Sequence, residues 1–85
     1  RYKRILLYFY VHPIYTEEMH MDVLTWQARH KRGITLKQLE KMTGIGKTTL
    51  NNIENGLVSP TLCQLEAIAR ALDVKMTDLF TSEYK

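Results

Sequence analysis

Apolar residues in the last third of the chain recur every three or four positions, which is the spacing of a helix with one buried face. Ser59 and Pro60 come just before this stripe, and a serine N-cap followed by proline at the first helical position is a common helix start. The sequence therefore predicts a helix that begins at Pro60 and buries one side. Its inward residues are expected to be Leu62, Leu65, Ile68, Ala69 and Leu72.

Two shorter helices are predicted upstream, and only Ile45 and Gly46 separate them. Thr35 and Gln38 have the T-x-x-Q spacing of a capping box, which marks the start of the first of these helices. Gly44 marks its end. Two short helices joined by a tight, glycine-containing turn form a helix-turn-helix. The inward residues are expected to be Leu36, Leu39 and Met42 in one helix, and Leu50 and Ile53 in the other.

The remaining segments after residue 20 are predicted to be helical as well. Thr16 is a suitable N-cap for a first helix, with Met21, Leu24 and Ala28 on one face. The pattern therefore predicts an all-α domain of five helices that spans residues 21–85. The short fifth helix is expected to carry Met76, Leu79 and Phe80.

Residues 1–20 form an N-terminal extension of a different character. Residues 5–11 are aromatic and β-branched, which favours a strand, and such a strand would act as a dimer arm by pairing with its twin. The alternative is that the extension packs on the first helix near Trp26. A start codon at Met19 or Met21 is a further interpretation, in which the residues before it are not native. These alternatives stay open at this point.

Composition narrows the possible functions. With 85 residues the chain is expected to form one domain with a small core, and its net charge of +3 suits an anionic partner. Cys63 is the single cysteine, so no disulfide can form within the chain, and a reducing, cytoplasmic setting is expected. The histidines share no ligand spacing with it, which predicts no metal and no cofactor. The longest apolar run, at residues 5–11, is too short for a membrane span, which needs about 20 residues.

The letters GIGKTTL at residues 44–50 allow two interpretations. A phosphate-binding loop would need a preceding strand and a further glycine upstream, where Lys41 stands. The residues before the loop are helical in pattern, so a nucleotide site is disfavoured. No nucleophile stands with a base and an orienting group elsewhere, so an enzyme is not predicted and no small-molecule substrate is evident. The letters suit the turn and first residues of a DNA-reading helix better.

The second helix of the pair has one face that carries no acidic residue. At about 100° per residue, its apolar residues point one way and its polar residues the other. The polar groups are a cation, a hydroxyl and amides, which donate to phosphates and to base edges. We call this surface the acid-free face, and it consists of Lys47, Thr48, Asn51, Asn52 and Asn55.

Two longer stretches carry a resemblance to a known family. They read ITLKQLEKMTGIGKTTLNNIENG and SPTLCQLEAIARALDVKMTDLF, and the likeness covers residues of about 22 to 80. The chain resembles the Cro/repressor-type, or XRE-like, helix-turn-helix regulators. The resemblance implies a five-helix, lambda-repressor-like DNA-binding domain. It also implies a transcriptional regulator, most simply a repressor that binds a palindromic operator as a homodimer.

The resemblance further implies roles for individual residues. In such proteins the second helix of the pair enters the major groove of double-stranded DNA with its N-terminal end leading. That would place Lys47, Thr48 and Asn52 at base edges, with Asn51 beside them. Asn55 matches a position that commonly contacts phosphate.

Other positions of the resemblance concern the backbone and the architecture. Gly46 would bring the chain close to DNA, and the helix starts near Leu36 and Thr61 would offer free amides to phosphates. Arg29 matches a position that often forms a salt bridge to the glutamate of IENG, which is Glu54 here. This pair is expected to be structural.

Three departures from the family pattern change these expectations. Leu36 replaces a frequent glutamine, so one DNA contact fewer is expected. Glu40 replaces a frequent alanine, so either the helix crossing opens or Glu40 turns toward a cation such as Lys41, and its charge would repel phosphate. Leu57 and Val58 replace basic residues and are candidates for contact with a partner subunit. Affinity for non-specific DNA is therefore expected to be modest.

Protein binding is an alternative function from a different class. Antitoxin-like proteins and other interaction modules use the same scaffold. In that case residues 1–20 and the Leu57-Val58 pair would form the contact surface. Salt-sensitive binding to a selected duplex distinguishes the two functions.

Overall fold

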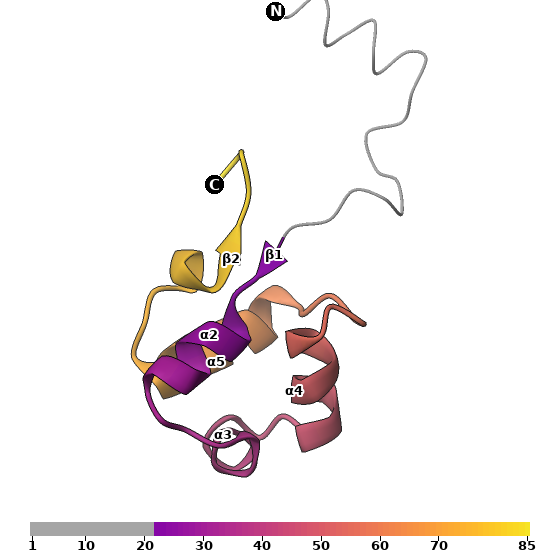
Figure 1. Cartoon of the computed structure of the whole chain (residues 1–85), viewed down its shortest axis with the longest axis vertical. Helices are drawn as coiled ribbons and strands as arrows, with labels where there is room; N and C mark the ends of the chain where they lie inside the picture. The colour runs from indigo at the N-terminus through magenta and orange to yellow at the C-terminus, as the bar shows by residue number, and fades with distance from the viewer. Residues whose placement is uncertain (1–21) are drawn as a thin grey trace, which may run out of the picture.

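The computed structural model describes residues 22–85, and Figure 1 shows the arrangement of its elements. The predicted strand at residues 5–11 and the predicted N-cap Thr16 lie outside these residues. The elements follow in the order β1 (Asp22–Val23), α2 (Thr25–Lys31), α3 (Leu36–Thr43), α4 (Lys47–Glu54), α5 (Leu62–Leu72), η1 (Met76–Leu79) and β2 (Phe80–Thr81).

The predicted count of five α-helices is not confirmed for residues 22–85, because the short fifth helix is the 3₁₀ helix η1. Residues 22–85 contain four α-helices, the 3₁₀ helix η1 and a two-stranded sheet. β1 pairs antiparallel with β2, with Asp22 opposite Thr81 and Val23 opposite Phe80. Leu24 extends this contact, since its amide donates to the carbonyl of Leu79 at 2.7 Å. Residues 22–24 are therefore held by the end of the domain and do not form part of a helix.

The core lies where α3, α4 and α5 meet, and it follows most of the predicted apolar stripes. α3 packs against both α4 and α5, and α2 contacts α4 and α5. Met42 and Leu62 were expected to face inward, but they are 51% and 74% exposed. The fully buried aliphatic side chains are Leu39, Leu50, Ile53, Ile68, Leu72 and Leu79.

The start of α5 differs from the prediction, which explains why Leu62 is exposed. Thr61, not Ser59, is the N-cap. Its hydroxyl accepts from the Gln64 amide at 3.0 Å, and the Gln64 side chain accepts from the Thr61 amide at 3.0 Å. This reciprocal capping box satisfies two amides, whereas Ser59 and Pro60 precede the helix. Leu62 is thus the first helical residue and has no earlier turn to pack against.

The start of α3 agrees with the prediction. Thr35 accepts from the Gln38 amide at 3.1 Å, and Gln38 accepts from the Thr35 amide at 2.8 Å. Gly44 ends the helix with a φ of 78°, a left-handed conformation that suits glycine. Both ends of α3 therefore lie where the sequence predicts them, and Gly44 begins the turn into α4.

Thr61→Ala is expected to lower the free energy of unfolding by about 1 kcal/mol, because the mutant loses the N-cap of α5. Ser59→Ala is the matched control and is expected to change it very little. Urea denaturation of the two variants measures both values. Equal losses in the two variants would contradict the assignment of Thr61 as the cap.

Candidate nucleic-acid interface

α4 is held in the domain by one face and presents the other to solvent. Leu50 and Ile53 are buried in the core. On the opposite side Lys47, Thr48, Asn51 and Asn55 are exposed, and Asn52 is half-buried. The first turn of α4 contains no acidic residue. The acid-free face is therefore available to a large partner, with Asn52 at its inner edge.

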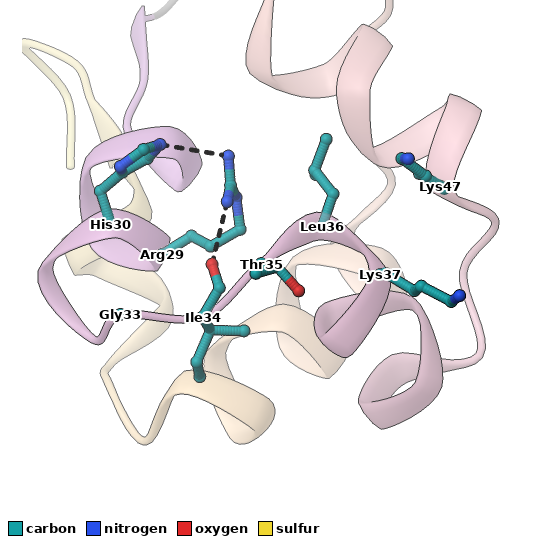
Figure 2. A pocket seen from close by; sticks show the side chains of 8 residues that line it. All are labelled: Arg29, His30, Gly33, Ile34, Thr35, Leu36, Lys37 and Lys47. Atoms are coloured by element: carbon teal, nitrogen blue, oxygen red, sulfur yellow. Dashed lines mark hydrogen bonds between the residues drawn. The ribbon is translucent and has the colours of Figure 1, made fainter.

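A buried ion pair connects α4 to α2. Arg29 donates from Nε to Oε2 of Glu54 at 2.7 Å and from Nη2 to Oε1 at 3.0 Å. The two side chains are only 10% and 4% exposed. The third nitrogen, Nη1, donates to the carbonyl oxygen of Ile34 at 2.9 Å, as Figure 2 shows. The expected Arg29–Glu54 pair is present, and it fixes the end of α4 relative to α2 and to the start of α3.

Glu40 does not pair with Lys41, the cation that was expected to attract it. Its Oε2 accepts a hydrogen bond from the backbone amide of Lys47 at 2.7 Å. Gly46, the N-cap of α4, has no side chain that could cap the helix. The carboxylate of α3 therefore caps α4 across the turn. This contact could not be predicted from the sequence, because it depends on how the two helices cross and not on spacing within one helix.

A shallow hollow lies at the start of α3, and several predicted residues gather around it (Figure 2). Leu36 lines the hollow from α3 and Lys47 from α4. Lys37, which was not predicted as a site residue, also lines the hollow. It could have been identified from the sequence, because it is a basic residue that directly follows Leu36 at a predicted helix start. The full lining is Arg29, His30, Gly33, Ile34, Thr35, Leu36, Lys37 and Lys47.

The capping boxes decide which backbone amides remain for an anion. In α3 the amides of Thr35 and Gln38 are engaged, so those of Leu36 and Lys37 lie at the helix start without an intrahelical partner. At α5 the amide of Thr61 itself donates to Gln64. Thr61 does not line the hollow at α3. By the same argument the amides of Leu62 and Cys63 remain at the start of α5. Both expected helix starts therefore keep amide donors, and those near Leu36 are the ones beside the hollow.

Neither a metal site nor a membrane-spanning helix is found within residues 22–85. No group of His, Cys, Asp and Glu side chains in this part of the chain is placed to hold a metal ion. None of the helices described for it combines the length and apolar character that a membrane span requires.

Comparisons with known proteins agree with this geometry. A helix-turn-helix family model matches residues 27–79. The HTH-type transcriptional regulator SlrR of Bacillus subtilis (strain 168) is 32% identical over 56 residues, which is 65% of this chain and 37% of that protein. The chain thus spans well under half the length of this relative.

A solved structure is matched over a larger share of its own chain than SlrR is. The N-terminal DNA-binding domain of SinR from Bacillus subtilis superposes with a TM-score of 0.63 at 29% identity. The superposition covers 72% of this chain and 90% of that domain. The residues matched by the family model include both helices joined by the glycine turn. The chain therefore belongs to the helix-turn-helix family, in its XRE-type branch.

Proposed function

We propose that this protein is a DNA-binding transcriptional regulator that reads a specific sequence with α4. The observation that supports the proposal is the acid-free face, which is exposed on a helix anchored by Leu50 and Ile53. The two relatives described above are named as a transcriptional regulator and as a DNA-binding domain. Insertion of such a helix into the major groove lets side chains at its N-terminal end reach base edges.

Base contacts are assigned to the first turns of α4. Lys47 can donate to guanine, and Asn52 or Asn51 can pair with adenine through both of its amide atoms. Thr48 lies between them on the same face. Among the described residues, Lys47 has no carboxylate partner for its ammonium group, so no ion pair must be broken before it binds.

Phosphate contacts are assigned around this helix. Gly46 brings the backbone of the turn close to the duplex, and Asn55 donates from the far end of α4. The amides of Leu36 and Lys37 belong to residues that line the hollow at α3, where a phosphate would meet a helix start, and the flexible side chain of Lys37 is proposed to bring its ammonium group to the same phosphate. Thr61 marks a second helix start, on α5, for a more distant phosphate.

We propose further that the protein acts as a homodimer, most simply as a repressor at a palindromic operator. One α4 reads only a few base pairs, and paired half-sites lie about 34 Å apart. Leu57 and Val58 lie in the loop after α4 and are 71% and 44% exposed. Apolar side chains at that place suit contact with a second copy across the operator axis.

Selection from random duplexes at two salt concentrations tests the proposal. A palindromic consensus with half-sites about one helical turn apart is expected. Binding should weaken with added salt because phosphate contacts release counterions. Recovery of no preferred sequence in dilute salt contradicts sequence-specific regulation, and a single, non-repeated site contradicts the dimer.

Protein binding remains the second candidate, and a specific observation favours it. Leu57, Val58 and Leu62 are all exposed within one short segment. Such a group of apolar side chains is typical of protein contact surfaces. An antitoxin-like interaction module would show binding to a protein partner with no dependence on duplex sequence.

A further inference from the structure

The leading end of α4 is held by a carboxylate from another helix. Glu40 of α3 accepts the backbone amide of Lys47 at 2.7 Å, and neither the Gly46 N-cap nor any acidic residue of the first turn does so. A helix start carries partial positive charge, which an anion stabilises. Glu40 is therefore the negative group that complements this end of α4.

The contact affects the residue that is assigned to base reading. Glu40 is half-buried, and its bond to an amide is a charge-assisted hydrogen bond, stronger than one between neutral groups. It holds the backbone of Lys47, while the Lys47 side chain stays on the acid-free face. The first turn of α4 is thus positioned before any duplex arrives, which reduces the ordering that binding requires.

The same carboxylate opposes a phosphate at this place. It occupies an amide that could otherwise donate to the duplex backbone, and it brings negative charge to the end of α4 that leads into the groove. Non-specific binding depends almost wholly on phosphate contacts, whereas specific binding also gains from base contacts. The negative charge of Glu40 therefore weakens non-specific complexes with DNA. Its hydrogen bond with the Lys47 amide favours the sequence-specific complex.

From these observations we infer that Glu40 determines sequence specificity: it positions Lys47 and lowers affinity for duplexes that lack the operator. The inference rests on the function proposed above. Glu40 thus has two effects, the positioning of the Lys47 backbone and the repulsion of phosphate, and two substitutions separate them. Glu40→Gln removes the charge and keeps an oxygen that can accept the Lys47 amide, whereas Glu40→Ala removes both.

The experiment compares affinities for the selected duplex and for a scrambled duplex of equal length by fluorescence anisotropy at low salt. Glu40→Gln is expected to bind the scrambled duplex about two- to fivefold more tightly, the effect of one charge near phosphates in water. Its affinity for the selected duplex changes less, so the ratio of the two affinities falls. Glu40→Ala gains equally on the scrambled duplex but binds the selected duplex more weakly than Glu40→Gln does.

Glu83→Gln is the matched control, because Glu83 is an exposed carboxylate two residues from the end of the chain, and Figure 1 shows the C-terminus away from α3 and α4. It should leave both affinities unchanged. Hydrogen exchange in the free protein gives an independent readout, and the Lys47 amide should exchange several-fold faster in Glu40→Ala than in wild type.

The outcomes separate this inference from the proposed function. If wild type prefers the selected duplex and Glu40→Gln keeps the wild-type ratio, the inference about Glu40 is wrong and the proposed function stands. Unchanged exchange of the Lys47 amide in Glu40→Ala also overturns the positioning role. If wild type binds both duplexes equally, the proposed function fails and the specificity role of Glu40 fails with it.

Discussion

Replacing Glu54 by alanine is expected to lower the free energy of unfolding by about 3 kcal/mol, because Arg29 then keeps a buried charge without a counter-ion. The guanidinium group gives two of its nitrogens to the Glu54 carboxylate. Its third contact, to the carbonyl of Ile34, cannot neutralise it. The stability of a whole domain is of the order of 5–15 kcal/mol, so this single loss is large.

Urea denaturation of wild type and Glu54→Ala measures the effect. Glu66→Ala is the control, since Glu66 is an exposed glutamate of α5, and it should change the stability very little. A double variant, Arg29→Met with Glu54→Leu, removes both charges together. It is expected to be more stable than the sum of the two single losses predicts, because no isolated charge remains. A loss in Glu54→Ala no greater than in Glu66→Ala would show that Arg29 finds water or another partner.

The second large effect concerns duplex binding. Lys47→Ala and Asn52→Ala are each expected to weaken binding to the selected duplex by about 1–3 kcal/mol, the range for one good base contact. The expected reason is the loss of donors at the leading part of the acid-free face. Discrimination at the contacted base pair should relax in each variant, because the remaining residues no longer reject the wrong base.

Titration of selected and scrambled duplexes measures this loss. Lys75→Ala is the matched control for charge, since Lys75 is exposed in the loop between α5 and η1. Figure 1 shows this loop on the side of the domain away from α4. Because Asn52 is half-buried, its variant also needs a denaturation curve to show that folding is intact. Equal weakening by Lys75→Ala and Lys47→Ala would mean that only overall charge matters, which contradicts base reading by Lys47.

The parts of the fold that could be predicted are those that depend on neighbours in sequence. The capping box of Thr35 and Gln38 and the end of α3 at Gly44 are confirmed. The core positions Leu50 and Ile53 are confirmed as well. Each follows from a pattern within one helix, where residues a few positions apart must share a face or a hydrogen bond.

The predictions were wrong where the local structure depends on a competing capping residue or on a partner far away in the sequence. Ser59 and Pro60 offered one valid helix start, but Thr61 with Gln64 forms two reciprocal hydrogen bonds and displaces it. Asp22 was assigned to a helix, yet its strand partner, Thr81, lies at the other end of the domain. A strand of two residues has no periodicity that the sequence could reveal.

In the candidate site too, features set by local sequence patterns could be predicted, and contacts between distant residues could not be predicted from spacing. The exposure of the acid-free face followed from helical periodicity, since the burial of Leu50 and Ile53 turns the polar residues outward. The Arg29–Glu54 pair was expected only from the family resemblance, because no local spacing connects residues so far apart. The contact from Glu40 to Lys47 was missed, since both helices must be in place before it can be recognised.

The pairing of β1 with β2 has a practical consequence for labelling. Because Asp22 lies opposite Thr81, the chain enters and leaves the domain side by side, at the end opposite α3 in Figure 1. A fluorophore or affinity tag joined after the second strand would therefore stand clear of the helices proposed to meet the duplex. A dye attached there would report rotation of the whole protein–DNA complex, and it would not stand between α4 and the major groove of the duplex.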